Sequence, residues 1–341
     1  MTLGVALLGA GRIGAVHAGA IAQHSDSKLL YVRSRHPDTE RLAARYHAHA
    51  VTDLDTIWGD PAVDAVVIAT PTPTHCDLIE QAVAAGKAVL CEKPIDQNIE
   101  RVEETWKRIG AEGASRVRIG FNRRFDPTFQ LVREQLDAGS AGRLEAIHIV
   151  TRVVNPPSYR YVQGSGGLFR DMTIHDLDLL RFLVDEEPTR IYAAGSALVD
   201  PELAAYDDID SAKLLLEYDS GMLVTIENSR RSAYGFDGRV EIFGSSGQVT
   251  ARVGGAPDVS VSNAEGTGRR PRFAQAPDVA FGSSFARQWE AFADAISEAR
   301  PIPGATFADG WAALSIAIAA KRSHQERQPV EIKGSFEEYM S

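Results

Sequence analysis

A glycine-rich turn near the N-terminus constrains the fold more than any other part of the chain. The motif Gly9-Ala10-Gly11-Arg12-Ile13-Gly14 follows a short apolar segment, residues 4–8, and opens an amphipathic stretch, residues 13–22. In this context the first glycine permits a tight turn, the second lets the backbone approach a pyrophosphate, and the third lets helix and strand pack closely. The helix N-terminus adds unsatisfied N–H groups. We therefore predict a dinucleotide-binding site formed by Gly9, Gly11, Arg12, Ile13 and Gly14.

The first third of the chain alternates apolar runs with amphipathic stretches. Continuous apolar runs are typical of parallel strands that are buried on both faces. Further strands are predicted over residues 28–32, 64–69, 88–91 and 117–120, and further helices over 39–46 and 74–85. Strands that alternate with helices indicate a doubly wound sheet, so we predict an α/β Rossmann domain over residues 1–122.

The pattern changes after Phe125. Helices are predicted over 127–136 and 167–184, and strands over 144–154, 190–197, 212–218, 222–228, 240–243 and 248–251. Such runs of strands favour an antiparallel or mixed sheet in an α+β domain. For residues 123–341 we predict an α+β domain with a large, mostly antiparallel, open-faced sheet. Residues 254–277 are polar and rich in Gly and Pro, which predicts a surface excursion. Two closing helices, 285–296 and 311–318, carry apolar stripes that indicate core packing and could pack back on the Rossmann domain.

Composition excludes several classes of protein. The net charge is -10, whereas binding to a phosphate backbone needs clustered Lys and Arg, so we expect no nucleic-acid partner. Cys76 and Cys91 are too few for a zinc site of about four ligands, and buried free thiols are expected. This small number of cysteines leads us to expect no metal. The N-terminal apolar run is too short for a membrane span and lacks a charged leader, which predicts a cytoplasmic enzyme with no membrane partner.

The end of the second predicted strand bears on the choice of cofactor. A Rossmann fold that prefers NAD usually carries an acid about 20 residues after the glycine motif, where it binds the ribose 2′-hydroxyl. Ser34 stands at this position, and Arg33 and Arg35 flank it. A guanidinium can hold a 2′-phosphate that a carboxylate would repel. We therefore predict NAD or NADP, with Ser34 and Arg35 near the ribose, and leave the choice open.

Three ionisable residues are candidates for catalysis. Lys93 follows the strand predicted over 88–91, at the edge where doubly wound sheets bind their ligands. Asp171 and His175 are four residues apart in a predicted helix and so share one face. A neutral imidazole can accept a proton from a hydroxyl, and a nearby carboxylate can orient the ring. Taken singly, each could be an ordinary surface residue; together they suggest dehydrogenation of an alcohol.

Several motifs give the sequence a specific resemblance. They are GAGRIG at 9–14, ATPTPTH at 69–75, CEKP at 91–94, GFNRRFDP at 120–127, GGLFRDMTIHDLDLLRFL at 166–183 and NSRRSAYGFDGRVEIFGSSG at 228–247. Over nearly its whole length the chain resembles the Gfo/Idh/MocA oxidoreductase family. Within that family it is most similar to the bacterial inositol 2-dehydrogenases.

The resemblance implies hydride transfer from a ring C–H to nicotinamide C4. It implies that Lys93 binds the reacting hydroxyl, that His175 accepts its proton, and that Asp171 positions both the hydroxyl and His175. Weaker assignments to the other ring hydroxyls are Asn155, Tyr159 and Tyr234. The cofactor would also be contacted by Thr70, Pro71, Pro73, His75, Glu92 and Lys93. The resemblance further implies a homo-oligomer, a dimer or a tetramer, built through the C-terminal sheet.

The resulting prediction is NAD(P)-dependent oxidation of a cyclic polyol, most specifically of myo-inositol to 2-keto-inositol (scyllo-inosose). Sibling substrates remain open: scyllo-inositol, or an aldose such as glucose or L-glucose oxidised at C1. A non-catalytic cofactor-binding regulator would be expected to lack Lys93, Asp171 or His175, and all three are present. A zinc-dependent alcohol dehydrogenase would need a cysteine arrangement that this chain does not have.

Overall fold

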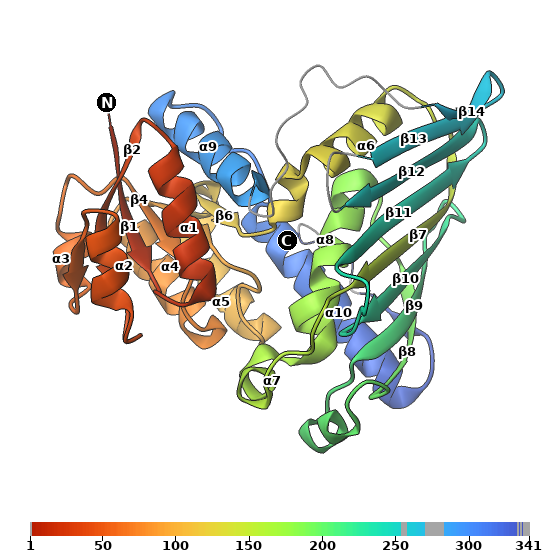
Figure 1. Cartoon of the computed structure of the whole chain (residues 1–341), viewed down its shortest axis with the longest axis horizontal. Helices are drawn as coiled ribbons and strands as arrows, with labels where there is room; N and C mark the ends of the chain where they lie inside the picture. Colours follow the sequence, from red (N-terminus) through yellow and green to blue (C-terminus); the bar gives the residue numbers. More distant parts are fainter. Residues whose placement is uncertain (1, 254–257, 270–282, 333, 335, 337–341) are drawn as a thin grey trace. The chain divides into compact units, whose positions relative to one another are not determined.

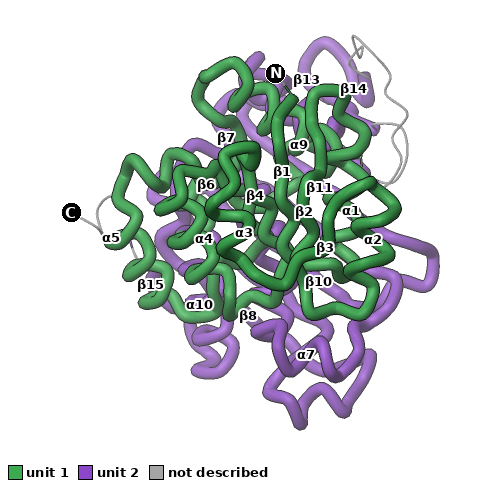
Figure 2. The backbone as a smooth tube through the Cα atoms, turned by 90° about the vertical axis from the view of Figure 1, so that its left-hand side faces the viewer, with its two compact units in different colours: residues 1–125, 282–311 green, residues 126–281, 312–341 purple. Residues whose placement is uncertain are grey.

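The computed structural model describes residues 2–253, 258–269, 283–332, 334 and 336. Two compact units divide the chain (Figure 2): residues 1–125 with 282–311, and residues 126–281 with 312–341. Helix α9 (Ser283–Ser297) packs against helix α1 (Arg12–Gln23), so a late segment of the sequence completes the first unit. Helix α10 (Phe307–Glu326) contributes its first turn to the first unit and the remainder to the second.

The first unit is built on a parallel sheet, some of whose strands are labelled in Figure 1. Its six strands have the order β3-β2-β1-β4-β5-β6. This order confirms the predicted doubly wound Rossmann fold. The strands are β1 (Leu3–Leu8), β2 (Ser27–Arg33), β3 (His49–Val51), β4 (Ala65–Ile68), β5 (Ala88–Cys91) and β6 (Val117–Ile119). The remaining helices are α2 (Thr39–Arg45), α3 (Asp55–Trp58), α4 (His75–Ala84) and α5 (Ile99–Ser115), with short 3-10 turns η1 (Thr72–Thr74) and η2 (Asn122–Phe125).

Burial on both faces of this sheet explains its apolar strands. Every residue of β1, β4 and β5 is buried. Trp289 and Phe292 of α9 belong to the same core cluster, and the Trp289 indole Nε1 donates to the Ser27 hydroxyl at 3.1 Å. Cys76 and Cys91 are both buried free thiols, as predicted.

The second unit contains a nine-stranded sheet with the order β14-β13-β12-β11-β7-β10-β9-β8-β15. Neighbouring strands are antiparallel except β7 and β10, so the prediction of a mostly antiparallel sheet is confirmed. The strands are β7 (Leu144–Arg152), β8 (Arg190–Ser196), β9 (Ser211–Glu217), β10 (Leu223–Ser229), β11 (Asp237–Gly244), β12 (Gly247–Val253), β13 (Asp258–Asn263), β14 (Gly266–Arg269) and β15 (Val330–Glu331). The other helices are α6 (Pro127–Asp137), α7 (Tyr159–Ser165), the π-helical turn η3 (Phe169–Thr173), α8 (Ile174–Leu183) and the 3-10 helix η4 (Pro201–Tyr206).

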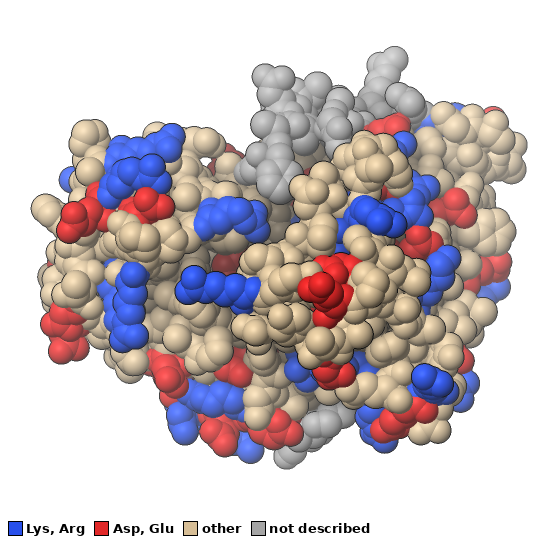
Figure 3. All heavy atoms as spheres, turned by 60° about the horizontal axis from the view of Figure 1, so that its bottom comes forward, with Lys and Arg blue, Asp and Glu red and all other residues tan. Residues whose placement is uncertain are grey.

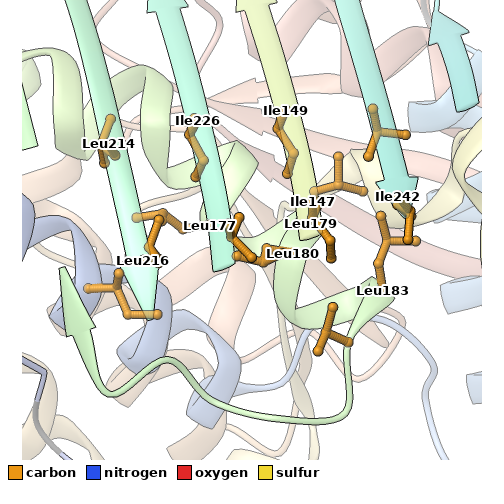
Figure 4. Close-up of a cluster of buried hydrophobic side chains, with 14 of the residues drawn as sticks. Ile147, Ile149, Leu177, Leu179, Leu180, Leu183, Leu214, Leu216, Ile226 and Ile242 are labelled. Atoms are coloured by element: carbon orange, nitrogen blue, oxygen red, sulfur yellow. The ribbon is translucent and has the colours of Figure 1, made fainter. Parts of the chain in front are cut away.

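Helix α8 is held on one face of this sheet by a continuous apolar cluster (Figure 4). Leu177, Leu180 and Leu183 meet isoleucines and leucines that alternate along β7, β9, β10 and β11. Alternation with a period of two places these strand residues on the covered face and their neighbours on the other. A well-packed helix of this kind provides a fixed base for the polar residues at its N-terminal end.

The predicted surface excursion over residues 254–277 is wrong for its middle part. Residues 258–263 and 266–269 form β13 and β14 at the edge of the large sheet, while 254–257 and 270–277 lie outside the described residues. Val259 and Val261 alternate with polar residues and are 2% and 5% exposed. This alternation is a strand signal that the surrounding Gly and Pro content obscured.

Candidate active site

The glycine-rich turn has the geometry that its three glycines predict. Gly9 has a φ of +110°, and a Cβ there would lie 2.2 Å from the carbonyl oxygen of Ala69. A Cβ on Gly14 would lie 2.0 Å from the carbonyl oxygen of Gly9, so only glycine lets α1 approach the turn this closely. Gly11 is open, with nothing within 4 Å of a Cβ. The turn is therefore tight against β4 yet leaves space at the N-terminus of α1 for a pyrophosphate.

A second loop, Thr70–Pro73, follows β4 beside this turn. The Thr70 and Thr74 hydroxyl oxygens are 2.7 Å apart, and the Thr74 hydroxyl also donates to the Pro71 carbonyl. His75 is fully buried, and its ring nitrogens lie 2.8 Å from the Thr70 carbonyl and 2.9 Å from the Pro94 carbonyl. Burial lowers the pKa of His75, while these two carbonyls oppose the shift. His75 therefore joins the loops that follow β4 and β5.

Glu92 and Lys93 follow β5 at the same sheet edge. The Glu92 side chain is 13% exposed, and its Oε1 lies 2.8 Å from Nε2 of the buried His17 in α1. Burial alone would raise the pKa of Glu92, but the His17 hydrogen bond and the charge of Lys93 bring it below the usual range. Glu92 is thus an anchored carboxylate that fixes the backbone carrying Lys93. Sequence reasoning did not single out His17, which lies in α1 only three residues beyond Gly14.

In the second unit, Asp171 and His175 lie on one continuous helical segment. Asp171 lies in the π-helical turn η3, and His175 lies in the first turn of α8. The Asp171 carboxylate accepts a hydrogen bond from the Tyr161 hydroxyl at 2.7 Å and from Arg230 Nη2 at 3.5 Å. π-helical turns are rare and occur often at functional sites, since the wider turn re-aims side chains. The predicted helix is thereby confirmed, and its first turn is wider than the α-helix that the sequence suggested.

A buried hydrogen-bond network joins the start of the same helix to the sheet. Asp176 is 0% exposed and accepts from the Thr151 hydroxyl and from Asn228 Nδ2, each at 2.6 Å. The side-chain amide oxygen Oδ1 of Asn228 in turn accepts from the Thr173 hydroxyl. Because unsatisfied buried polar groups are costly, this network holds the start of α8 at one position on the sheet.

A buried ion pair supports the preceding turn. Arg230 is 1% exposed and donates from Nη1 to Asp208 at 2.7 Å. Asp208 also accepts from the backbone N–H of Leu168 at 2.7 Å, directly before η3. Arg230 thus links Asp208 to Asp171. Neither Arg230 nor Asp208 was identified from the sequence, although an arginine in the run that follows β10 could have prompted a search for its carboxylate.

The three weaker substrate candidates have different surroundings. Asn155 is exposed in the connection between β7 and α7. Tyr159 donates its hydroxyl to Asp200 at 2.7 Å and stacks on Tyr206. Tyr234 is 62% exposed and donates to Asp237 at 2.7 Å. Within α7 it is Tyr161 that contacts Asp171, so Tyr161 joins the candidates.

Among the described residues, no group of three or more His, Cys, Asp and Glu side chains is arranged to hold a metal ion. None of the described helices has the length and the apolar character that a membrane crossing requires. On the face of the molecule in Figure 3, basic and acidic side chains are interspersed.

These features define an oxidoreductase with a dinucleotide-binding Rossmann domain. The family model described as "Oxidoreductase family, NAD-binding Rossmann fold" matches residues 3–121, and the model "GFO/IDH/MocA C-terminal domain" matches residues 129–250. The chain belongs to the Gfo/Idh/MocA oxidoreductase family, as its motifs predicted. It is an NAD-binding oxidoreductase of the inositol 2-dehydrogenase type.

Full-length relatives support this assignment. The chain is 41% identical to inositol 2-dehydrogenase of Rhizobium meliloti (strain 1021), with 97% of this chain and 100% of the relative covered. The crystal structure of a myo-inositol dehydrogenase from Corynebacterium glutamicum is similar, with a TM-score of 0.86, 38% identity, and coverage of 98% and 100%. The scyllo-inositol dehydrogenase of Lactobacillus casei, solved with bound NAD(H) and scyllo-inositol, has a TM-score of 0.83, 28% identity, and coverage of 97% and 99%.

Proposed function

We propose that this protein oxidises myo-inositol to 2-keto-inositol with NAD or NADP as the acceptor. The observation that carries the proposal is a set of three ionisable residues. Lys93 follows β5 in the first unit, next to Glu92, whose carboxylate is held by His17. Asp171 and His175 lie in η3 and α8 of the second unit. The similarity to inositol 2-dehydrogenase over the whole length supports the choice of a cyclic polyol.

The residues of the first unit fit a nicotinamide dinucleotide. The space at Gly11 and the closeness of Gly9 and Gly14 are what a pyrophosphate at the start of α1 requires. Arg12 and Ile13 would lie at the same helix end, Ser34 and Arg35 at the adenosine ribose, and Glu92 with the 70–75 loop nearer the nicotinamide. When bound, the nicotinamide supplies the acceptor for the hydride that the alcohol carbon loses.

The chain's own residues manage the hydroxyl. The Lys93 ammonium binds the reacting oxygen and stabilises negative charge as it develops there. The neutral His175 imidazole accepts the hydroxyl proton, so that the C–O single bond becomes a carbonyl. Asp171 positions His175 and a substrate hydroxyl, while Tyr161 and Arg230 hold its carboxylate. Asn155, Tyr159 and Tyr234 stay weaker proposals for further ring contacts.

The test measures initial rates of cofactor reduction with myo-inositol, scyllo-inositol, glucose and L-glucose, each with NAD and with NADP. Myo-inositol should give the highest kcat/KM. Lys93→Ala and His175→Ala should each lower kcat by about 10²-fold or more, the usual effect of losing an acid–base group. Activity that prefers a hexose would reject the substrate, and normal turnover by either variant would reject the mechanism.

A homo-oligomer is part of the same proposal. The face of the large sheet opposite α8 exposes Tyr192, Leu223 and Phe243, which are 39%, 49% and 49% exposed. Apolar side chains on an open sheet face are suited to association with a second copy of the chain. Light scattering coupled to size-exclusion chromatography should give the mass of a dimer or a tetramer, and Leu223→Lys should lower it. A monomeric wild-type mass would exclude this part of the proposal.

A further inference from the structure

The first unit contains a pocket beside the glycine-rich turn whose charge is unusual for a site that binds only NAD. Its volume is about 280 Å³. One wall is the turn and the first residues of α1, and the other is the connection from β2 into α2 together with α2 itself. The lining residues are Ala10, Gly11, Arg12, Ala15, His36, Asp38, Arg41, Leu42 and Arg45.

Basic groups dominate this lining. Three arginines, Arg12, Arg41 and Arg45, line the pocket together with one acidic residue, Asp38. That carboxylate already receives Arg41 Nη2 at 2.9 Å, and its second oxygen lies 3.7 Å from Nδ1 of His36. With Asp38 paired, two guanidinium groups remain in excess. The pocket is therefore positive and suited to an anion.

The end of β2 provides no acid that would oppose an anion. Ser34 stands where an NAD-preferring site carries Asp or Glu, and its hydroxyl oxygen accepts the backbone N–H of His36 at 3.0 Å. This hydrogen bond turns the chain toward α2 and brings His36 into the pocket wall. Arg33 is directed elsewhere, because its Nε donates to the Thr52 carbonyl at 3.3 Å.

We infer that this pocket binds the 2′-phosphate of NADP, so that the enzyme binds NADP more tightly than NAD. The inference rests on the proposed function, since it concerns the cofactor of that same site. In a Rossmann fold the adenosine ribose lies between the glycine-rich turn and the end of the second strand, and this pocket lies between the same turn and the segment that follows β2. A phosphate dianion offers three acceptor oxygens, which guanidinium forks bind in pairs.

Calorimetric titration with 2′,5′-ADP and with 5′-AMP measures how much the 2′-phosphate contributes to binding, without any turnover. The affinities for NADP and NAD are then compared in the same way. The fragment with the 2′-phosphate should bind about tenfold more tightly or better, the size expected for one charge-assisted hydrogen bond. The difference should shrink as salt is raised, since the pocket is open to solvent. Equal affinities, or tighter binding of 5′-AMP and NAD, would overturn the inference and leave the proposed function standing. Binding of none of the four ligands would overturn both.

Substitutions test which residues produce the preference for the 2′-phosphate. Arg41→Gln combined with Arg45→Gln should remove most of the preference for 2′,5′-ADP and leave the affinity for 5′-AMP within about twofold. Ser34→Asp should reverse the preference, because a carboxylate repels the phosphate and accepts from the ribose hydroxyl. Arg33→Gln is the matched control from the same strand end and should retain the preference. A preference unchanged by the double substitution and by Ser34→Asp would place the phosphate elsewhere and contradict the inference.

Discussion

Replacement of Asp208 by Asn tests the support beneath Asp171 quantitatively. Asp208 is 6% exposed and accepts hydrogen bonds from Arg230, from the Leu168 amide and from the Ile209 amide, at 2.7, 2.7 and 2.8 Å. An asparagine keeps the shape but leaves the buried Arg230 guanidinium without its nearest counter-charge. Losing one partner of a buried ion pair costs about 3–5 kcal/mol. Because Asp171 lies 3.5 Å from Arg230, we expect the lower end, about 3 kcal/mol.

The neighbouring residue offers a matched control. Asp207 pairs with Lys321 at 2.7 Å, but the two side chains are 72% and 28% exposed. Its φ of +52° suits asparagine as well as aspartate, so Asp207→Asn should cost less than about 1 kcal/mol. The same charge is thus removed at two adjacent positions with different burial.

Urea unfolding should be followed by circular dichroism, because tryptophan emission reports the wrong unit. All four tryptophans, Trp58, Trp106, Trp289 and Trp311, belong to the first unit, whereas Asp208 lies in the second. Asp208→Asn should lower the free energy of unfolding by about 3 kcal/mol, and Asp208→Asn with Arg230→Met should recover part of the loss. Equal, small losses for Asp208→Asn and Asp207→Asn would show that the buried pair of Asp208 and Arg230 does not stabilise the second unit.

Three further predictions concern other parts of the molecule. Gly14→Ala should cost about 1–3 kcal/mol of unfolding free energy through overpacking, whereas Gly11→Ala should unfold like the wild type in urea but bind dinucleotide more weakly in calorimetry. The hydrogen bond from Arg152 lowers the pKa of Glu227 to about 2, so its contribution to stability is complete above about pH 4.5 and is lost as the pH falls toward 2. When the free energy of unfolding is measured between about pH 4.5 and pH 2, Glu227→Gln should lose less of it than the wild type. Equal losses in the two proteins would contradict this prediction. Tyr161→Phe should lower kcat/KM by about 3- to 10-fold through the lost hydrogen bond to the Asp171 carboxylate, and an unchanged kcat/KM would exclude Tyr161 from the site.

The fold was predictable where burial leaves a continuous apolar signal. The strand predicted over 88–91 coincides with β5, and the prediction over 64–69 covers β4, because both strands are buried on both faces. Helix α5 was not predicted, although Ile99, Val102 and Ile109 recur at helical spacing. Its many charged residues mask this narrow apolar stripe, which is typical of a helix with one buried face.

The candidate site was predictable only where its residues are close in sequence. The glycine-rich turn and the pair Asp171 and His175 each lie within one short motif. The contacts of Asp176 with Thr151 and Asn228 join residues 25 and 52 positions apart, and only the sheet brings them together. The local sequence also could not separate two tyrosines in α7, since the rotation of a short helix decides which one meets Asp171.

Transfer of the isotope from myo-inositol deuterated at C2 tests whether the ring carbon gives its hydride to the nicotinamide. The purified enzyme should oxidise this substrate to the ketone, and mass spectrometry should find one deuterium on the reduced nicotinamide. Reduced nicotinamide that carries no deuterium, or no ketone formed with either cofactor, would contradict the proposed oxidation of myo-inositol.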